Sequence, residues 1–312
     1  MEHITPVNHD SFFCTGTQCP APCAAPVDMT WTRTLGSLCE TGLSMACPRA
    51  AKLMLLHREA TAFSVERDQS ESAPLAGVSA SQLALMLDAR RTMDIILQNR
   101  SLPFRTDVVL ALTYGAEFDP MIATDSRYAY EELDWGFTEQ PYRQVQAVVQ
   151  LQGLWEEKKR DICELLAHIQ ELCQGESVLL NHLTQTRQMF ERMSGAEYRS
   201  LRDQFDKEMA PREYLFENLL VYYVHRYFLA DAAAQTVWPG LQLLAVSFAL
   251  IRAMAARLWK ETGTLTDNAL AALCWQYGRA VEETPEVMTA LRERFQRDDL
   301  YSRDRLQRLL WN

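Results

Sequence analysis

The stretch SASQLALMLDARRTMDIILQNR, residues 79–100, carries the clearest folding signal in the chain. Its opening serines are good helix caps, because a serine hydroxyl can accept a hydrogen bond from a free N–H of the first turn. Apolar residues then recur at the spacing of one helix face: Leu83, Met86, Leu87, Met93 and Ile96. We therefore expect an amphipathic helix that packs on a core.

The helical period continues on both sides of this stretch. A short helix is expected just after Cys47, and others over about 104–114, 141–173, 177–193, 196–208, 212–231, 238–261, 266–283, 286–296 and 303–310. We recognise no hairpin and no run of alternating β-branched residues. The prediction is an all-α fold without a parallel sheet. A multi-helix domain over residues 51–312 follows a small, loop-rich, cysteine-containing N-terminal module over residues 1–50.

Charge argues against nucleic acid as a partner. The 312 residues carry 31 basic and 41 acidic side chains, a formal charge of −10, and no basic stripe is evident. Acidic residues gather between Glu117 and Asp134. We interpret this segment as a solvated acidic loop in preference to a docking surface for a lysine-rich partner.

The chain also shows no secretory or membrane signal. Its first residues lack a basic, then apolar, leader. The longest apolar stretch, Leu241 to Trp259, is interrupted by Arg252 and Arg257 and is interpreted as a buried helix. We expect a cytoplasmic protein without membrane contact, whose eight cysteines are thiols, metal ligands or packed side chains.

A cluster of cysteines near the N-terminus suggests a metal site. Cys14, Cys19 and Cys23 lie in CTGTQCPAPC, where glycine and proline permit the tight turn that would present three thiolates together. Cys39 and Cys47 are the nearest donors for a fourth position. Zinc and an iron–sulfur cluster both accept four thiolates, so the spacing leaves both open, and unligated thiols are the alternative.

The remaining candidate ligands are assigned to packing. We expect Cys163, Cys173 and Cys274 to be helix-packing residues. His168, His182 and His225 fall in predicted helices, and we expect no metal site from them. The chain has no glycine-rich nucleotide loop.

Three stretches together resemble the flagellin lysine-N-methylase family. They are FFCTGTQCPAPC at 12–23, GLSMACPRAAKLMLL at 42–56 and YLFENLLVYYVHRYF at 214–228. The chain differs from the family pattern in having no second cysteine after Cys23 and no longer cysteine-containing segment before Cys47. It therefore resembles a shortened or divergent member.

The resemblance implies an enzyme that transfers methyl groups from S-adenosylmethionine to surface lysines of flagellin. It also implies that cysteines hold an iron–sulfur cluster, with zinc as the alternative; the candidate ligands are Cys14, Cys19, Cys23 and Cys47. The competing hypothesis is a catalytically inactive helical relative that binds flagellin or another protein partner. A metal-responsive module acting on some other substrate is a third interpretation.

The family's Glu-Asn helix corresponds to Glu217 and Asn218 here. From the residues alone, these two would be a hydrogen-bonding patch on a mostly buried helix. A lysine must be neutral to attack a methyl sulfonium, so a methyltransferase needs a desolvating pocket with aromatic or carboxylate neighbours. The tyrosines around Glu217 are candidates for its walls.

Overall fold

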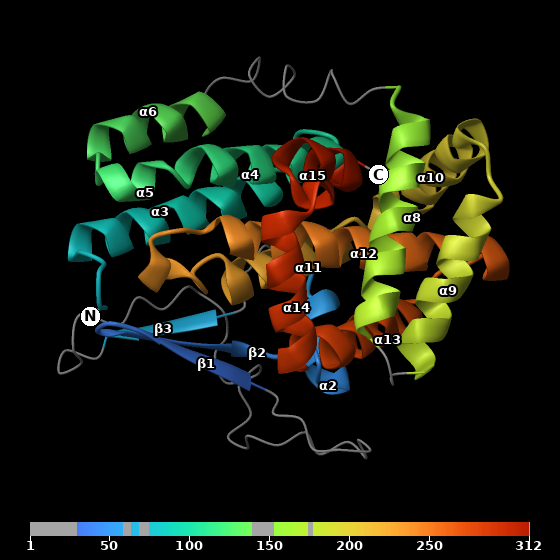
Figure 1. Ribbon diagram of the computed structural model, residues 1–312, viewed down its shortest axis with the longest axis horizontal. Helices are drawn as coiled ribbons and strands as arrows, with labels where there is room; N and C mark the ends of the chain where they lie inside the picture. Colours follow the sequence, from blue (N-terminus) through green and yellow to red (C-terminus); the bar gives the residue numbers. More distant parts are fainter. Residues whose placement is uncertain (1–29, 59–63, 69–74, 139–152, 174–176, 312) are drawn as a thin grey trace.

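The computed structural model describes residues 30–58, 64–68, 75–138, 153–173 and 177–311. The α-helices are α2 (Pro48–Leu55), α3 (Ala80–Leu97), α4 (Phe104–Phe118), α5 (Met121–Thr124), α6 (Arg127–Thr138), α8 (Trp155–Leu172), α9 (Ser177–Glu191), α10 (Gly195–Met209), α11 (Tyr214–Tyr227), α12 (Trp238–Thr262), α13 (Asp267–Tyr277), α14 (Pro285–Arg297) and α15 (Arg303–Leu310). Single turns are η1 (Ala210–Arg212), η2 (Ala232–Ala234), η3 (Gly278–Glu282) and η4 (Asp299–Tyr301). The strands are β1 (Thr30–Leu35), β2 (Leu38–Leu43) and β3 (Ser64–Asp68). The predicted all-α body is confirmed (Figure 1).

Helix α3 begins as its sequence predicts. The Ser79 hydroxyl accepts a hydrogen bond from the Gln82 N–H at 3.0 Å, and the Ser79 N–H donates to the Gln82 side chain at 2.9 Å. This reciprocal capping box satisfies two backbone donors at the helix start. Met86, Met93 and Ile96 of the predicted stripe are buried, and α3 packs on α4, α6 and α11.

Helix α12 is the centre of the body. It contacts α4, α8, α9, α10, α11, α13, α14 and α15. Of the described helices, α12 alone is long and apolar enough to cross a membrane, but 94% of its most apolar window is buried inside the protein, as in a core helix. It passes so close to α11 that a Cβ on Gly240 would overlap the Tyr227 carbonyl oxygen.

The strands were missed by the sequence analysis. β1, β2 and β3 form an antiparallel sheet in that order, the only sheet among the described residues, and it lies beside the body in Figure 1. Gly36 at φ +60° and Ser37 make the two-residue turn between β1 and β2. Gly-Ser between two runs is a recognised hairpin signal, since glycine tolerates positive φ. Arg33 of β1 then donates to the His225 and Arg226 carbonyls at the end of α11.

The predicted acidic loop is also wrong. Much of that segment is helical, in α5 and α6. Tyr130, Leu133 and Phe137 of α6 are buried, whereas Glu131 and Glu132 are exposed. The charges therefore occupy the outer face of an amphipathic helix.

Two predictions lie outside the described residues in part. The predicted helix over 141–173 is found as α8 from Trp155, and residues 139–152 are not among those described. The predicted domain boundary after residue 50 stays a prediction.

Candidate functional site

The predicted cysteine ligands fall mainly in the N-terminal segment. Cys14, Cys19 and Cys23 lie outside the described residues, so their convergence stays a prediction. Cys47 is the N-cap of α2, its side chain is fully buried, and Pro48 follows at the first helical position. A thiolate there would be favoured by the free N–H groups of the first helical turn. The one predicted ligand that is described thus occupies a position suited to a thiolate.

A cavity of about 310 Å³ lies where α11 begins, between α4 and η1. Its lining combines three carboxyl groups, one guanidinium and an apolar wall: Leu97, Arg100, Leu102, Phe104, Asp107, Ala210, Pro211, Glu213, Tyr214 and Glu217. We call this cavity the acidic pocket. It places Tyr214, one of the expected aromatic neighbours, beside Glu217.

Asp107 is the unusual group of the acidic pocket. It lies in the first turn of α4 and is only 3% exposed. Its Oδ1 has no hydrogen-bond partner among the described residues. Burial, together with the like charges of Glu213 and Glu217, raises the pKa of Asp107 to about 8. A carboxyl group with that pKa can take up or release a proton near neutral pH.

Glu217 differs from Asp107 because it is paired. Arg100 donates from Nε to one Glu217 oxygen at 3.0 Å and from a terminal nitrogen to the other at 3.1 Å. This two-pronged contact fixes the Glu217 carboxylate and neutralises its charge. Burial raises the pKa of Glu213, and the neighbouring Asp206 carboxyl adds to the shift. Among the described residues, Asp107 and Glu213 therefore have no ion pair with an arginine, and these two carboxyl groups suit a cationic ligand.

Asn218 has the structural role expected from the residues. Its side-chain amide donates to the Leu55 carbonyl at 3.1 Å and to the His57 carbonyl at 2.5 Å. These bonds attach α11 to the end of α2. Arg100, which lines the acidic pocket, donates to the Arg58 carbonyl at 3.3 Å, just beyond the end of α2. Cys47 caps the other end of this eight-residue helix, which is about 12 Å long at 1.5 Å per residue.

A second carboxyl group that the sequence analysis missed anchors the middle of α11. Glu282 is buried in the π-helical turn η3 and accepts hydrogen bonds from the hydroxyls of Tyr222 at 2.8 Å, Tyr223 at 3.1 Å and Tyr227 at 2.9 Å. Burial raises the pKa of Glu282, and the tyrosine hydrogen bonds oppose that rise. The Tyr222 hydroxyl also accepts from the Met45 N–H at 3.2 Å. The network thereby fixes the position of Met45, in the segment before Cys47. Three tyrosines on one predicted helix were the sequence signal for such a network, because buried tyrosine hydroxyls need hydrogen-bond partners.

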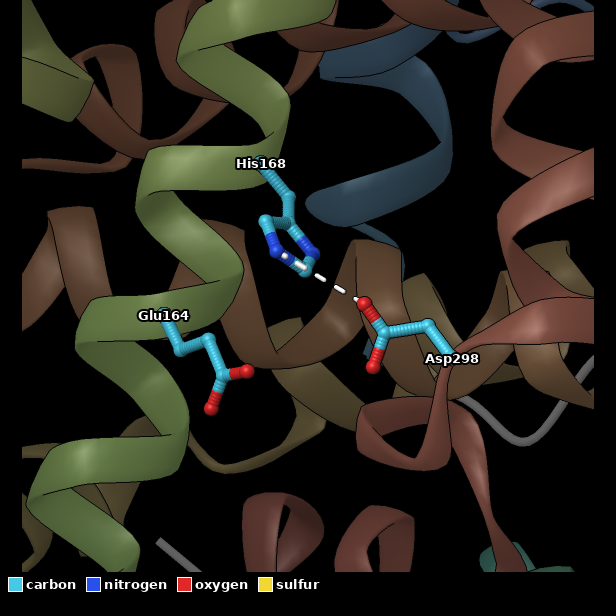
Figure 2. A group of neighbouring side chains, drawn as sticks. All are labelled: Glu164, His168 and Asp298. Carbon is cyan, nitrogen blue, oxygen red and sulfur yellow. Dashed lines mark ion pairs between the residues drawn. The ribbon is translucent and has the colours of Figure 1, made fainter.

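The expectation that His168 has no partner of metal-ligand type was wrong. Glu164 precedes it by one helical turn on α8, and Asp298 approaches from the end of α14. The three side chains offer ligand atoms within 4.8 Å of one another (Figure 2). The Glu-x-x-x-His spacing was visible in the sequence, because residues four apart share a helix face. Asp298, 130 residues further on, could not have been assigned from spacing.

A buried lysine lies on the same helix. Lys158 is fully buried, its Nζ has no hydrogen-bond partner among the described residues, and it lies 4.2 Å from the ring centre of Trp155 and 5.6 Å from that of Trp311. Burial, reinforced by Arg105, lowers the pKa of Lys158 to about 7. Neither the acidic pocket nor the cavity beside Asp298 is lined by Lys158, so we assign it to the core, where its burial costs stability.

Comparison with known proteins identifies the family. The model of the FliB lysine N-methylase C-terminal domain matches residues 90–309. No curated protein and no solved structure matches the chain. The matched range contains every residue that lines the acidic pocket, whereas Cys47 and the cysteine cluster precede it. The family resemblance is confirmed over more than half of the chain, and of the three stretches the one at 214–228 lies in the matched range. The chain belongs to the FliB lysine N-methylase family.

Proposed function

We propose that this protein transfers methyl groups from S-adenosylmethionine to lysine side chains of flagellin, and that the acidic pocket receives the lysine. The family match supports lysine methylation. The observation that carries the assignment of the pocket is Asp107, a buried carboxyl group with a pKa of about 8 whose Oδ1 has no hydrogen-bond partner in the described part of the chain. Catalytic bases are often tuned to such values.

The charge of the pocket suits a lysine ammonium group. Glu213 and the ionised form of Asp107 attract the cation, while Glu217 is occupied by Arg100. Phe104 and Tyr214 can contact the aliphatic part of the lysine chain. A guest that fills the pocket displaces water, which strengthens every charge interaction inside it.

Asp107 then acts as the general base. Its ionised carboxylate takes a proton from the lysine ammonium, which leaves a lone pair on the amine nitrogen. S-adenosylmethionine supplies, when bound, an electrophilic methyl carbon on a positively charged sulfur. The neutral amine would be the nucleophile for that methyl carbon, and the thioether, which keeps the electron pair of the C–S bond, would be the leaving group. Asp107 releases to solvent the proton that it took from the ammonium, and its carboxylate can then accept the extra proton of the methylated nitrogen.

We further propose that Cys14, Cys19, Cys23 and Cys47 hold an iron–sulfur cluster, with zinc as the alternative metal. Support comes from the turn-forming cysteine spacing and from the place of Cys47 at a helix start. Metal binding would order the N-terminal module, since it supplies folding free energy that loop-rich sequence lacks. Through α2 and Asn218, an ordered module would also fix one side of the acidic pocket.

The test uses the full chain, purified without oxygen, with flagellin and methyl-labelled S-adenosylmethionine. We expect label on flagellin lysines. The substitution Asp107→Asn should lower the rate at least about 100-fold, the usual contribution of a general base. Asp304→Asn is the matched control, because Asp304 is exposed on α15 and does not line the acidic pocket.

Two results would contradict the proposal. If Asp107→Asn methylates as fast as the wild type, the acidic pocket is not the acceptor site. If the metal-loaded wild type binds flagellin and transfers no methyl group, the chain is the inactive relative.

A further inference from the structure

We propose that Glu164, His168 and Asp298 form a binding site for a divalent transition-metal ion of the Zn²⁺ class, separate from the cysteine cluster. Glu164 and His168 project from one face of α8, and Asp298 meets them from the junction of α14 and η4 (Figure 2). Their candidate ligand atoms all lie within 4.8 Å of one another, and each side chain is half-buried. Two of the three ligands therefore lie on one helix, and the third lies in the short connection after α14.

His168 is oriented as a metal ligand. Its Nδ1 lies 3.1 Å from the Tyr301 hydroxyl, and its Nε2 lies 3.7 Å from an Asp298 oxygen. The second distance is too long for a good hydrogen bond. It is close to the roughly 3.4 Å that separates two donors bound to one tetrahedral Zn²⁺ at about 2.1 Å each. Ligating histidines almost always have the other ring nitrogen hydrogen-bonded, as Tyr301 provides here.

In each of the two carboxylates, one oxygen accepts a hydrogen bond from the protein. Asp298 accepts a hydrogen bond from the Leu300 N–H at 2.9 Å through Oδ1, while its Oδ2 faces His168. Arg305 donates to Glu164 Oε2 at 2.5 Å. In each carboxylate, the other oxygen accepts no hydrogen bond among the described contacts and is available to bind a metal ion. Outer contacts of this kind fix the direction of metal ligands.

The charges and donor types select the ion. Two carboxylates and a neutral imidazole carry a formal charge of −2. The ion pair of Arg305 with Glu164 offsets part of it, and the remaining negative charge favours a cation. One nitrogen and two oxygen donors suit Zn²⁺ and neighbouring transition metals better than Ca²⁺, which prefers six or more oxygens. Three protein ligands leave an open position. A cavity of about 490 Å³ borders the group at Asp298 and Tyr301.

Zinc titration of the full chain tests the site. Elemental analysis and competition with a chelator should give one Zn²⁺ bound by the wild type beyond any at the cysteines. His168→Gln and Glu164→Gln should each lose that equivalent or weaken it at least about 100-fold, since even outer-shell changes cost 10–100-fold. His182→Gln, which changes a histidine on α9, is the matched control and should bind as the wild type does.

Cobalt substitution separates this site from the thiolate cluster. Co²⁺ bound by nitrogen and oxygen gives weak visible bands, whereas Co²⁺ bound by thiolate adds strong sulfur-to-metal bands. We expect the weak bands to vanish in His168→Gln and the sulfur bands to be unaffected. Equal metal content, affinity and spectra in the wild type, His168→Gln and Glu164→Gln would overturn the proposal. Unchanged circular dichroism of the metal-free variants confirms that they fold.

Discussion

Replacing Asp107 with asparagine should make the protein more stable, and increasingly so as the pH rises. Asparagine keeps the shape of the side chain and cannot ionise. The native pKa of Asp107 is about 8 and the ordinary value is 3.8. Because the native state holds this proton over a pH range where the unfolded chain releases it, the free energy of unfolding of the wild type should fall between about pH 4 and pH 8.

The size of the effect follows from the two pKa values. Each unit between them corresponds to about 1.36 kcal/mol, so the upper limit at pH 8 is about 5 kcal/mol. Water entry and relaxation around the pocket reduce such limits, and we expect about 2–3 kcal/mol at pH 8. Near pH 4 both side chains are neutral in the native state, and the difference should be about zero.

Urea denaturation at pH 4, 6 and 8 measures this difference. Asp304→Asn, the exposed control, should change the free energy of unfolding by less than about 0.5 kcal/mol at every pH. A constant difference between wild type and Asp107→Asn across the three pH values would refute the reasoning, since it would mean that Asp107 is ionised in the native state. Higher stability combined with lost methyl transfer would show that this carboxyl group is retained for function.

Three further substitutions test the core, the helix crossing and the predicted cluster. Lys158→Met should raise the free energy of unfolding by about 1–3 kcal/mol at pH 7, because the native pKa of Lys158 is about 7 and its ordinary value is 10.5. The wild type gains stability as the pH rises from 7 to 10.5, so the difference between the two proteins should shrink. A gain of the same size at pH 10.5 would contradict this. Gly240→Ala should lower it by about 1–3 kcal/mol in urea denaturation, because its Cβ would overlap the Tyr227 carbonyl oxygen; a neutral result would mean that α11 and α12 are further apart. Cys19→Ser should release iron or zinc in elemental analysis while Cys39→Ser retains it, and equal metal in both would exclude Cys19 as a ligand.

Helix positions were predictable because their causes are local. The capping box at Ser79 and Gln82 involves residues three apart, and the stripes of α9 to α15 repeat within each helix. The hairpin was missed although Gly36 and Ser37 signalled it and threonines alternate along β1, because the strands are only six residues long and each contains a charged residue. Helix α6 was missed because the six acidic residues from Glu117 to Asp134 outnumber the three buried apolar residues, Tyr130, Leu133 and Phe137, that fix the helix.

The candidate sites depended on contacts that sequence spacing does not contain. The Glu164–His168 pair shares one helix, so it could have been identified from the chain alone, but its third member, Asp298, comes from a distant segment. Family membership was evident in short cysteine-rich and aromatic stretches, because such motifs are contiguous.

The acidic pocket shows most clearly what the tertiary structure decided. In the sequence, Asp107 is one of many acidic residues in predicted helices, and nothing separates it from the exposed Asp304. Folding buries Asp107 and brings Glu213 and Glu217, over 100 residues away, to its side, while Arg100 pairs with Glu217 alone. The sequence determined the helices and the family through local periodicity and motif. The protonation of Asp107 was decided only in the folded protein, because solvent exclusion and the distances between charges arise from packing.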